Sequence, residues 1–274
     1  MLNLEKYSGL PIQIRDDFSL VFGDGLLPVE PTIREFSSMK NYLKDPSATY
    51  SGREVYRFYR DIAKPEHLDV VHEFGLQYDI TIIQPGKLGE EFTKTAGHYH
   101  PFKGGTNIRV PEVYEVLYGR AFFLIQRASP DLERLEEVYL ISAERGDKMV
   151  LPPGFGHISI NPTDDILVLA NWQPWKNQGL YDAYEKHNGG AYYVVESQRI
   201  GQKGKSTTES FVPNLHYNSL PKLNLVKPRD LPQYNLVRAI PMYFTATKDL
   251  STLDFVANPE KYLDELIPEK LFKP

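Results

Sequence analysis

The chain has 274 residues, 31 Lys and Arg against 36 Asp and Glu, and no cysteine. Without thiols it cannot form disulfides, iron–sulfur clusters, thiolate zinc sites or a cysteine nucleophile, so any bound metal must use nitrogen and oxygen ligands. A formal net charge of −5 argues against a nucleic-acid binder, which needs clustered positive charge.

Residues 1–55 are predicted to form an arm rather than a domain. Their first residues lack the basic-then-apolar layout of a signal peptide, and no apolar run in the chain approaches the roughly 20 residues that cross a bilayer. We therefore expect a cytoplasmic protein with no membrane contact. Within the arm, Ile33, Phe36 and Met39 recur at three-residue steps, which predicts a helix over residues 32–43.

The middle of the chain, residues 56–197, is predicted to form an all-β barrel or sandwich. Short runs rich in Ile, Val, Tyr, Phe and Leu alternate there with Gly, Pro and charged turns, a pattern typical of antiparallel strands. The eight runs are YDITIIQ, EVYEVLYG, AFFLIQ, LEEVYLIS, DKMVLP, HISIN, DILVLANWQ and AYYVVES.

The remaining residues, 198–274, are predicted to form a C-terminal extension that packs on the barrel or on a partner subunit. The segment QKGKSTTES is polar and predicts a surface loop, and five prolines divide the chain that follows. A last helix is predicted over residues 259–266, with Tyr262, Leu263 and Leu266 on one face.

Three histidines have the spacing of a metal site. His98 and His100 are two residues apart, so an extended strand would send both imidazoles to the same face. A third histidine, His157, follows a Pro/Gly turn, and Glu112 opens a strand that ends at Gly119. Three imidazoles and a carboxylate suit Fe²⁺, Mn²⁺, Zn²⁺ or Ni²⁺ and leave positions open for substrate, which favours a functional metal over a structural one.

These residues resemble the two motifs of the cupin family. The second motif is matched at every fixed position, which are Gly146, Pro152, Gly154, His157 and Asn161. The first motif departs in two ways: its usual first glycine is Phe92, and eleven residues separate His100 from Glu112. Glu112 and Glu115 lie on opposite faces of the strand, and either face could point inward, so strand alternation does not decide which one is the carboxylate ligand of the metal. The spacing to Gly119 favours Glu112. The resemblance implies an all-β cupin fold, a double-stranded β-helix or jelly-roll barrel, with helical N- and C-terminal additions.

A narrower resemblance covers residues 56–196. The strings TIIQPGKLGEEFTKTAGHYHP, EVYEVLYG and VLPPGFGHISIN are similar to those of cupin-type glucose-6-phosphate isomerases. The resemblance implies a sugar-phosphate substrate, a homodimer, and one divalent metal per subunit, with Fe²⁺ expected first and Zn²⁺, Mn²⁺ or Ni²⁺ as alternatives. The implied metal ligands are His98, His100, Glu112 and His157.

Substrate-binding residues are implied by the same resemblance. The phosphate-binding groups fall on Thr81, Thr95, Gly97 and Tyr181, and an active-site tyrosine falls on Tyr114. A further, N-terminal tyrosine falls on Tyr56 or Tyr59, of which Tyr59 is taken as the candidate. Two positions depart from the family pattern, Gln173 for a tyrosine and Gly179 for a histidine, so the sugar could differ from glucose.

The resemblance implies an aldose–ketose interconversion, and this reaction would use the metal and the carboxylate of the site. A metal would polarise the C1 and C2 oxygens while Glu112 carries a proton between the carbons with Tyr114 as its hydrogen-bond partner, and a hydride shift would use the same residues. The alternatives are a non-catalytic sugar-phosphate-binding cupin, an isomerase or epimerase acting on another substrate, and an Fe²⁺ dioxygenase. A dioxygenase would have no use for the T-x-GHYH phosphate loop.

Overall fold

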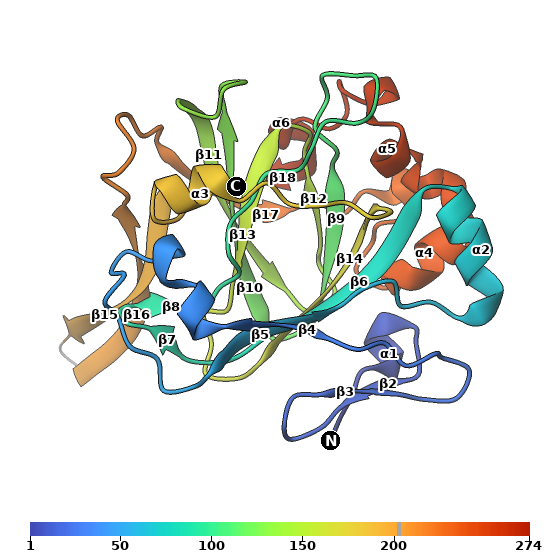
Figure 1. Cartoon of the computed structure of the whole chain (residues 1–274), viewed down its shortest axis with the longest axis horizontal. Coiled ribbons are helices and arrows are strands. Elements are labelled where there is room, and N and C mark those ends of the chain that lie inside the picture. Colours follow the sequence, from blue (N-terminus) through green and yellow to red (C-terminus); the bar gives the residue numbers. More distant parts are fainter. Residues whose placement is uncertain (202–203) are drawn as a thin grey trace.

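The computed structural model describes residues 1–201 and 204–274, and two facing β-sheets form its centre (Figure 1). The first sheet has the order β12-β9-β14-β6-β5-β4, and the second has the order β13-β10-β11-β17-β18. From β9 to β14 the chain passes repeatedly between the two sheets, which is the jelly-roll connection of a cupin barrel. The predicted all-β cupin fold is confirmed.

The strands of these two sheets have the following bounds. The first sheet contains β12 (Lys148–Leu151), β9 (Glu112–Tyr118), β14 (Leu167–Pro174), β6 (Leu76–Ile83), β5 (Glu54–Tyr59) and β4 (Thr32–Glu35). The second contains β13 (Phe155–Ile160), β10 (Arg120–Ala128), β11 (Leu135–Glu144), β17 (Leu223–Pro228) and β18 (Phe272–Lys273).

Two smaller sheets and several short helices surround the barrel. The sheets are formed by β1 (Leu2–Asn3), β2 (Ile12–Ile14) and β3 (Leu20–Phe22), and by β7 (Lys87–Leu88), β8 (Glu91–Phe92), β15 (Tyr192–Gly201) and β16 (Gly204–Pro213). The α-helices are α1 (Glu5–Ser8), α2 (Pro65–Glu73), α3 (Asp182–Lys186), α4 (Met242–Lys248), α5 (Asp254–Ala257) and α6 (Pro268–Leu271). No helix in the described ranges is long and apolar enough to cross a membrane.

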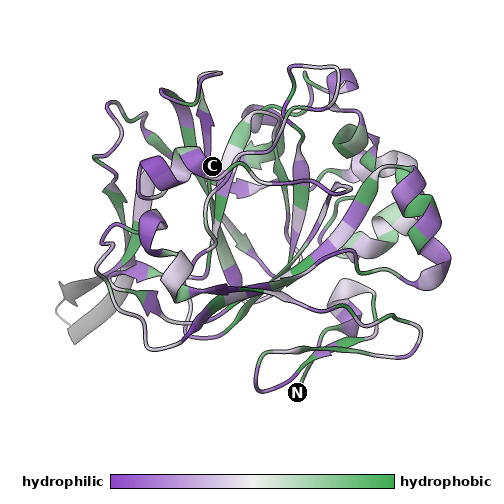
Figure 2. Cartoon of the chain, viewed as in Figure 1, coloured by the Kyte–Doolittle hydropathy of each residue, from purple (hydrophilic) through white to green (hydrophobic). Residues whose placement is uncertain are grey.

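All eight predicted strand runs coincide with strands, namely β6, β9 to β14 and β15. Residues 112–117 of β9 are buried without a break, because both faces of this sheet are covered. On the outer face the C-terminal chain packs on β14, where the Trp172 indole N–H donates to the Met242 carbonyl (3.2 Å) and the Trp172 ring stacks on Tyr243. Figure 2 shows polar residues interspersed with hydrophobic ones along the barrel strands, as expected for a barrel that contains a polar site.

The predicted helix over residues 32–43 is wrong. Thr32–Glu35 is strand β4, which pairs with β5, and only two short 3₁₀ turns follow, Phe36–Ser38 and Lys40–Tyr42. Ile33 does not face a core, since it is 48% exposed. The free edge of β5 offers backbone partners to this segment, and that tertiary pairing outweighs the three-residue spacing.

Two predictions for the C-terminal extension are also wrong. The segment QKGKSTTES is not a loop where the structure describes it, because β16 begins at Gly204 and pairs with β15; Gln202 and Lys203 lie outside the described residues. Over residues 259–266 there is only the 3₁₀ turn Pro259–Lys261 and a further turn at Tyr262. Leu266 is buried but Leu263 is 44% exposed, so the expected residues do not form one buried face.

Candidate metal and substrate site

The barrel brings the three motif histidines together. His98 forms an isolated antiparallel bridge with His157 of β13, in which each backbone N–H donates to the other's carbonyl (3.3 and 3.0 Å). His100 lies two residues further on and is fully buried. One ring nitrogen from each imidazole lies within 4.8 Å of the others.

Each imidazole has a buried ring nitrogen without a hydrogen-bond partner: Nδ1 of His98, Nε2 of His100 and Nδ1 of His157. Burial lowers the pKa of His98 to about 3 and the pKa of His157 well below its usual value, so both rings are neutral at neutral pH. His100 Nδ1 donates to the Val110 carbonyl (2.9 Å), which leaves the lone pair on Nε2. Three imidazoles that each have an unsatisfied ring nitrogen fit a divalent metal.

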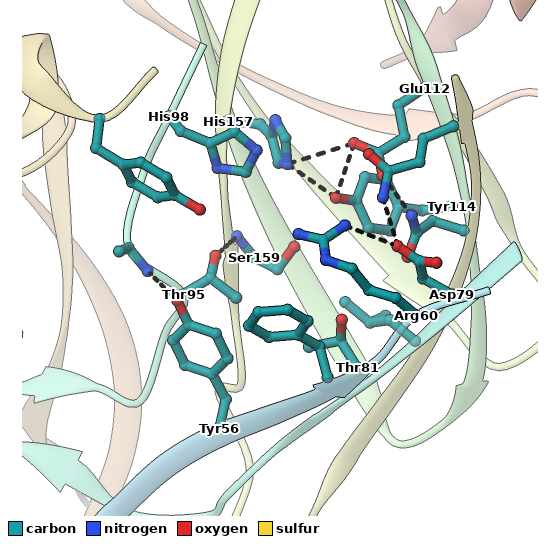
Figure 3. Close-up of a pocket in the computed structure, with 16 residues that line it drawn as sticks. Tyr56, Arg60, Asp79, Thr81, Thr95, His98, Glu112, Tyr114, His157 and Ser159 are labelled. Atoms are coloured by element: carbon teal, nitrogen blue, oxygen red, sulfur yellow. Dashed lines mark hydrogen bonds and ion pairs between the residues drawn. The ribbon is translucent and has the colours of Figure 1, made fainter. Parts of the chain in front are cut away.

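Glu112 lies beside these imidazoles. Its Oε2 is 3.2 Å from His100 Nε2 and 3.7 Å from His157 Nε2, and its side chain is 3% exposed. Asn171 Nδ2 donates to Glu112 Oε1 (2.5 Å), and the Tyr114 hydroxyl donates to Glu112 Oε2 (3.0 Å) while lying 2.8 Å from His157 Nε2 (Figure 3). These contacts hold the carboxylate in one orientation.

A pocket opens in front of this cluster, and most of the predicted site residues line it. Those that do are Thr81, Thr95, His98, Glu112, Tyr114, His157 and Tyr181 (Figure 3). The remaining members of its wall are Tyr56, Phe58, Arg60, Asp79, Ala96, Ser159, Leu169, Asn171 and Gln173. His100, which is fully buried, is not one of the lining residues.

Two predicted substrate residues do not line the pocket. Tyr59 is 1% exposed, and its hydroxyl accepts the Leu20 N–H (2.9 Å), away from the site; this corrects its assignment to the substrate site. Tyr56, three residues earlier on β5, points to the opposite face and lines the pocket instead. Gly97 faces the Tyr184 ring, since a Cβ added there would lie 2.1 Å from Tyr184 Cδ1.

Sequence reasoning missed a polar cluster at one end of the pocket, centred on Asp79. Its carboxylate accepts hydrogen bonds from Arg60 Nη1 (3.0 Å), the Asp61 N–H (2.8 Å) and the side-chain amides of Gln77 and Gln173. Burial raises the pKa of Asp79 to about 6, although these donors oppose the shift. Strand alternation from Thr81 would have identified Asp79, because the two residues share a face of β6.

Comparison with known proteins identifies a matching family model and similar proteins. The family model described as "Glucose-6-phosphate isomerase (GPI)" matches residues 33–210. "Glucose-6-phosphate isomerase" of Thermococcus litoralis is 31% identical over 177 residues, which is 62% of this chain and 80% of the relative. The protein of the same name from Pyrococcus abyssi is 29% identical over 170 residues, 60% of this chain and 79% of the relative. Because the family model covers more than half of the chain, the chain belongs to the glucose-6-phosphate isomerase family.

Proposed function

We propose that the protein is a metal-dependent aldose–ketose isomerase that interconverts glucose 6-phosphate and fructose 6-phosphate. The observation that carries the proposal is the position of Glu112, a buried carboxylate 3.2 Å from a ring nitrogen of a three-histidine cluster, at the wall of a hydroxyl-lined pocket. The relatives in Thermococcus and Pyrococcus bear the name of this activity.

The metal would be held by His98, His100 and His157 together with Glu112. We expect Fe²⁺ first, and Zn²⁺, Mn²⁺ or Ni²⁺ as alternatives, because all four ions accept mixed imidazole and carboxylate ligands. A bound divalent ion supplies positive charge where an oxygen of the substrate becomes negative, a contribution of several kcal/mol in order of magnitude.

Glu112 is assigned the proton transfer between the two carbons. Among the residues of the pocket wall it is the carboxylate beside the imidazoles, and its two hydrogen bonds orient it. Tyr114 keeps the carboxylate aimed at the pocket, and Thr81, Thr95 and Tyr181 are assigned to the phosphate-bearing end of the sugar.

A coupled assay tests the proposal. Protein reconstituted separately with Fe²⁺, Mn²⁺, Zn²⁺ or Ni²⁺ is given fructose 6-phosphate, and glucose 6-phosphate is measured beside EDTA-stripped protein. Turnover with one or more metals, abolished by EDTA and restored by adding the metal back, is the expected result. Absence of turnover with all four would contradict the proposal and favour a protein that binds a sugar phosphate without converting it.

Running the reaction in deuterated water distinguishes proton transfer from a hydride shift. A proton carried by Glu112 exchanges with solvent, so deuterium should appear at C2 of the glucose 6-phosphate formed. Deuterium at C2 would exclude a hydride shift, whereas its absence would be compatible with a hydride shift or with a proton that Glu112 returns before it exchanges.

The proposal extends to assembly and compartment. We propose a cytoplasmic homodimer in which the N- and C-terminal additions, residues 1–55 and 198–274, pack on the barrel or on the partner subunit. Sedimentation equilibrium of the full chain tests the dimer, since a single species with the mass of one chain would contradict it.

A further inference from the structure

Arg34, on strand β4, lies against the wall of the pocket. Strand β4 pairs with β5 so that Arg34 is opposite Tyr56. The guanidinium carbon of Arg34 is 5.6 Å from the centre of the Tyr181 ring and 6.0 Å from the centre of the Tyr56 ring. Both tyrosines line the pocket, so Arg34 of the N-terminal arm lies next to the pocket wall without being one of its lining residues.

Arg34 has no acidic partner within residues 1–201 and 204–274: no carboxylate oxygen comes within 4.0 Å of its guanidinium nitrogens. The neighbouring arginines differ, because Arg53 is paired with Glu35 (2.6 Å) and Arg57 with Glu54 (2.6 Å). A half-buried charge without a counter-charge is unfavourable, and the two tyrosine rings offset only part of that cost. The positive charge of Arg34 is therefore available to a ligand.

Arg60, an arginine that lines the pocket, differs from Arg34 because its charge is paired with a carboxylate. Its Nη1 is 3.0 Å from Asp79 Oδ2, so its charge is already balanced within the wall. Figure 3 shows Arg60 and Asp79 on one side of the pocket, with Tyr56 and Thr95 on the other. The end of the pocket next to Arg34 is thus the end with unbalanced positive charge.

Hydroxyl groups at this end can donate to an anion. The Tyr56 hydroxyl oxygen accepts the Ala96 N–H (3.3 Å), and Thr95 Oγ1 accepts the Ser159 N–H (3.0 Å). Neither bond uses the hydroxyl hydrogen, so both O–H groups remain able to donate into the pocket. Two oriented hydroxyls beside an unpaired guanidinium make a suitable environment for a phosphate group.

We propose that Arg34 binds the phosphate of the substrate, so that strand β4 completes the substrate site of the barrel. The inference rests on the proposed function for the identity of the substrate. It goes beyond that function because it assigns the binding of the negatively charged phosphate to a residue of the N-terminal arm.

The test compares Arg34→Gln and Arg34→Lys with Arg53→Gln, which removes a mainly exposed arginine of the same arm. For each metal-loaded protein, kcat and KM for fructose 6-phosphate are measured, together with inhibition by inorganic phosphate. In Arg34→Gln, KM and the inhibition constant for phosphate should both rise about 10- to 100-fold, because hydrogen bonds to a charged group are lost. We expect kcat to change little, Arg34→Lys to be intermediate, and Arg53→Gln to match the wild type.

An unchanged KM and phosphate inhibition constant in Arg34→Gln would overturn the inference, as would a loss confined to kcat. Should Arg34→Gln fail to fold, the decision rests on Arg34→Lys, which keeps the positive charge and loses the planar guanidinium group. Wild-type values of KM and of the phosphate inhibition constant in that variant count against the proposal.

If the wild type itself shows no turnover, the proposed function fails. Calorimetric titration of inorganic phosphate into wild type and Arg34→Gln then tests Arg34 separately, and equal affinities would overturn it.

Discussion

Glu112 and Glu115 lie three residues apart on β9, and their carboxylates point to opposite faces of the sheet. Glu112 faces the imidazoles, with Oε2 3.2 Å from His100 Nε2. Glu115 faces the C-terminal chain, where it is 2.9 Å from Lys148 Nζ and accepts the Met242 N–H (2.7 Å). Two buried glutamates of one strand therefore have different surroundings: Glu112 lies beside the imidazoles, where we propose that it acts in chemistry, and Glu115 is paired with Lys148.

Substituting each glutamate by glutamine should separate the two roles. Glu112→Gln keeps the shape of the side chain but cannot accept a proton, so kcat at saturating metal should fall about 100-fold or more. Glu115→Gln leaves the Lys148 charge buried without a carboxylate, which should lower the free energy of unfolding by about 3 kcal/mol with kcat unchanged. Coupled assays and urea unfolding measure the two effects, and full activity in Glu112→Gln would refute its assignment as the base.

Much of the barrel and of the metal cluster could be predicted from local patterns. Strand runs bounded by Gly and Pro depend on alternation and turn chemistry, which short segments encode. The histidines at positions 98, 100 and 157 are recognisable in the sequence, because two are spaced for one strand face and the third follows a Pro/Gly turn. These features need no knowledge of which distant segments meet.

The parts that could not be predicted depend on distant contacts. Residues 32–43 have helical spacing, yet residues 32–35 form a strand because β5 offers them a free edge. Whether Tyr56 or Tyr59 faces the pocket depends on which face of β5 the barrel covers, and this is set by the pairing of β5 with β6. Arg34 carries no motif, and its position beside the pocket follows only from the register of β4 on β5.

Tyr56 and Tyr59 should respond differently to loss of their hydroxyl groups. In Tyr59→Phe the buried Leu20 N–H loses its acceptor, which should cost about 1–3 kcal/mol of stability without altering kcat/KM. In Tyr56→Phe the pocket loses a donor, so kcat/KM should fall up to about 10-fold, the effect of one neutral hydrogen bond. Steady-state kinetics and urea unfolding of the two variants check this, and a kinetic defect in Tyr59→Phe would contradict its placement outside the site.

Gly97 should tolerate no side chain. A Cβ at this position would lie 2.1 Å from Tyr184 Cδ1 and 2.8 Å from Ile158 Cγ1, so Gly97→Ala forces the chain beside His98 to shift. Overpacking of this kind costs about 1–3 kcal/mol, and metal content after dialysis should fall as well. The control is Gly104→Ala, because a Cβ there has no neighbour within 4 Å. Equal unfolding midpoints and equal metal contents in the two variants would contradict the prediction.

Asp79 should make stability depend on pH. Burial raises its pKa from 3.8 to about 6 in the folded protein, so the folded state binds the proton more tightly than the unfolded chain does. Its contribution to the free energy of unfolding is therefore fully present below about pH 4, declines as pH rises through 6, and is absent above that value. A shift of about two units corresponds to roughly 3 kcal/mol as an upper limit.

The comparison that isolates this contribution is wild type against Asp79→Asn, both stripped of metal so that histidine ligation adds no pH dependence. Asparagine cannot titrate, so the free energy of unfolding of the wild type minus that of the variant should fall between pH 4.5 and pH 7 by up to about 3 kcal/mol. Arg60→Gln provides an independent check on the sign. The Arg60 charge opposes the rise in the pKa of Asp79, so removing it should move the pH-dependent window upward. A difference that rises with pH would mean that the hydrogen bonds from Arg60, Gln77 and Gln173 outweigh burial, and that Asp79 is fully ionised in the folded protein at the pH of the assay.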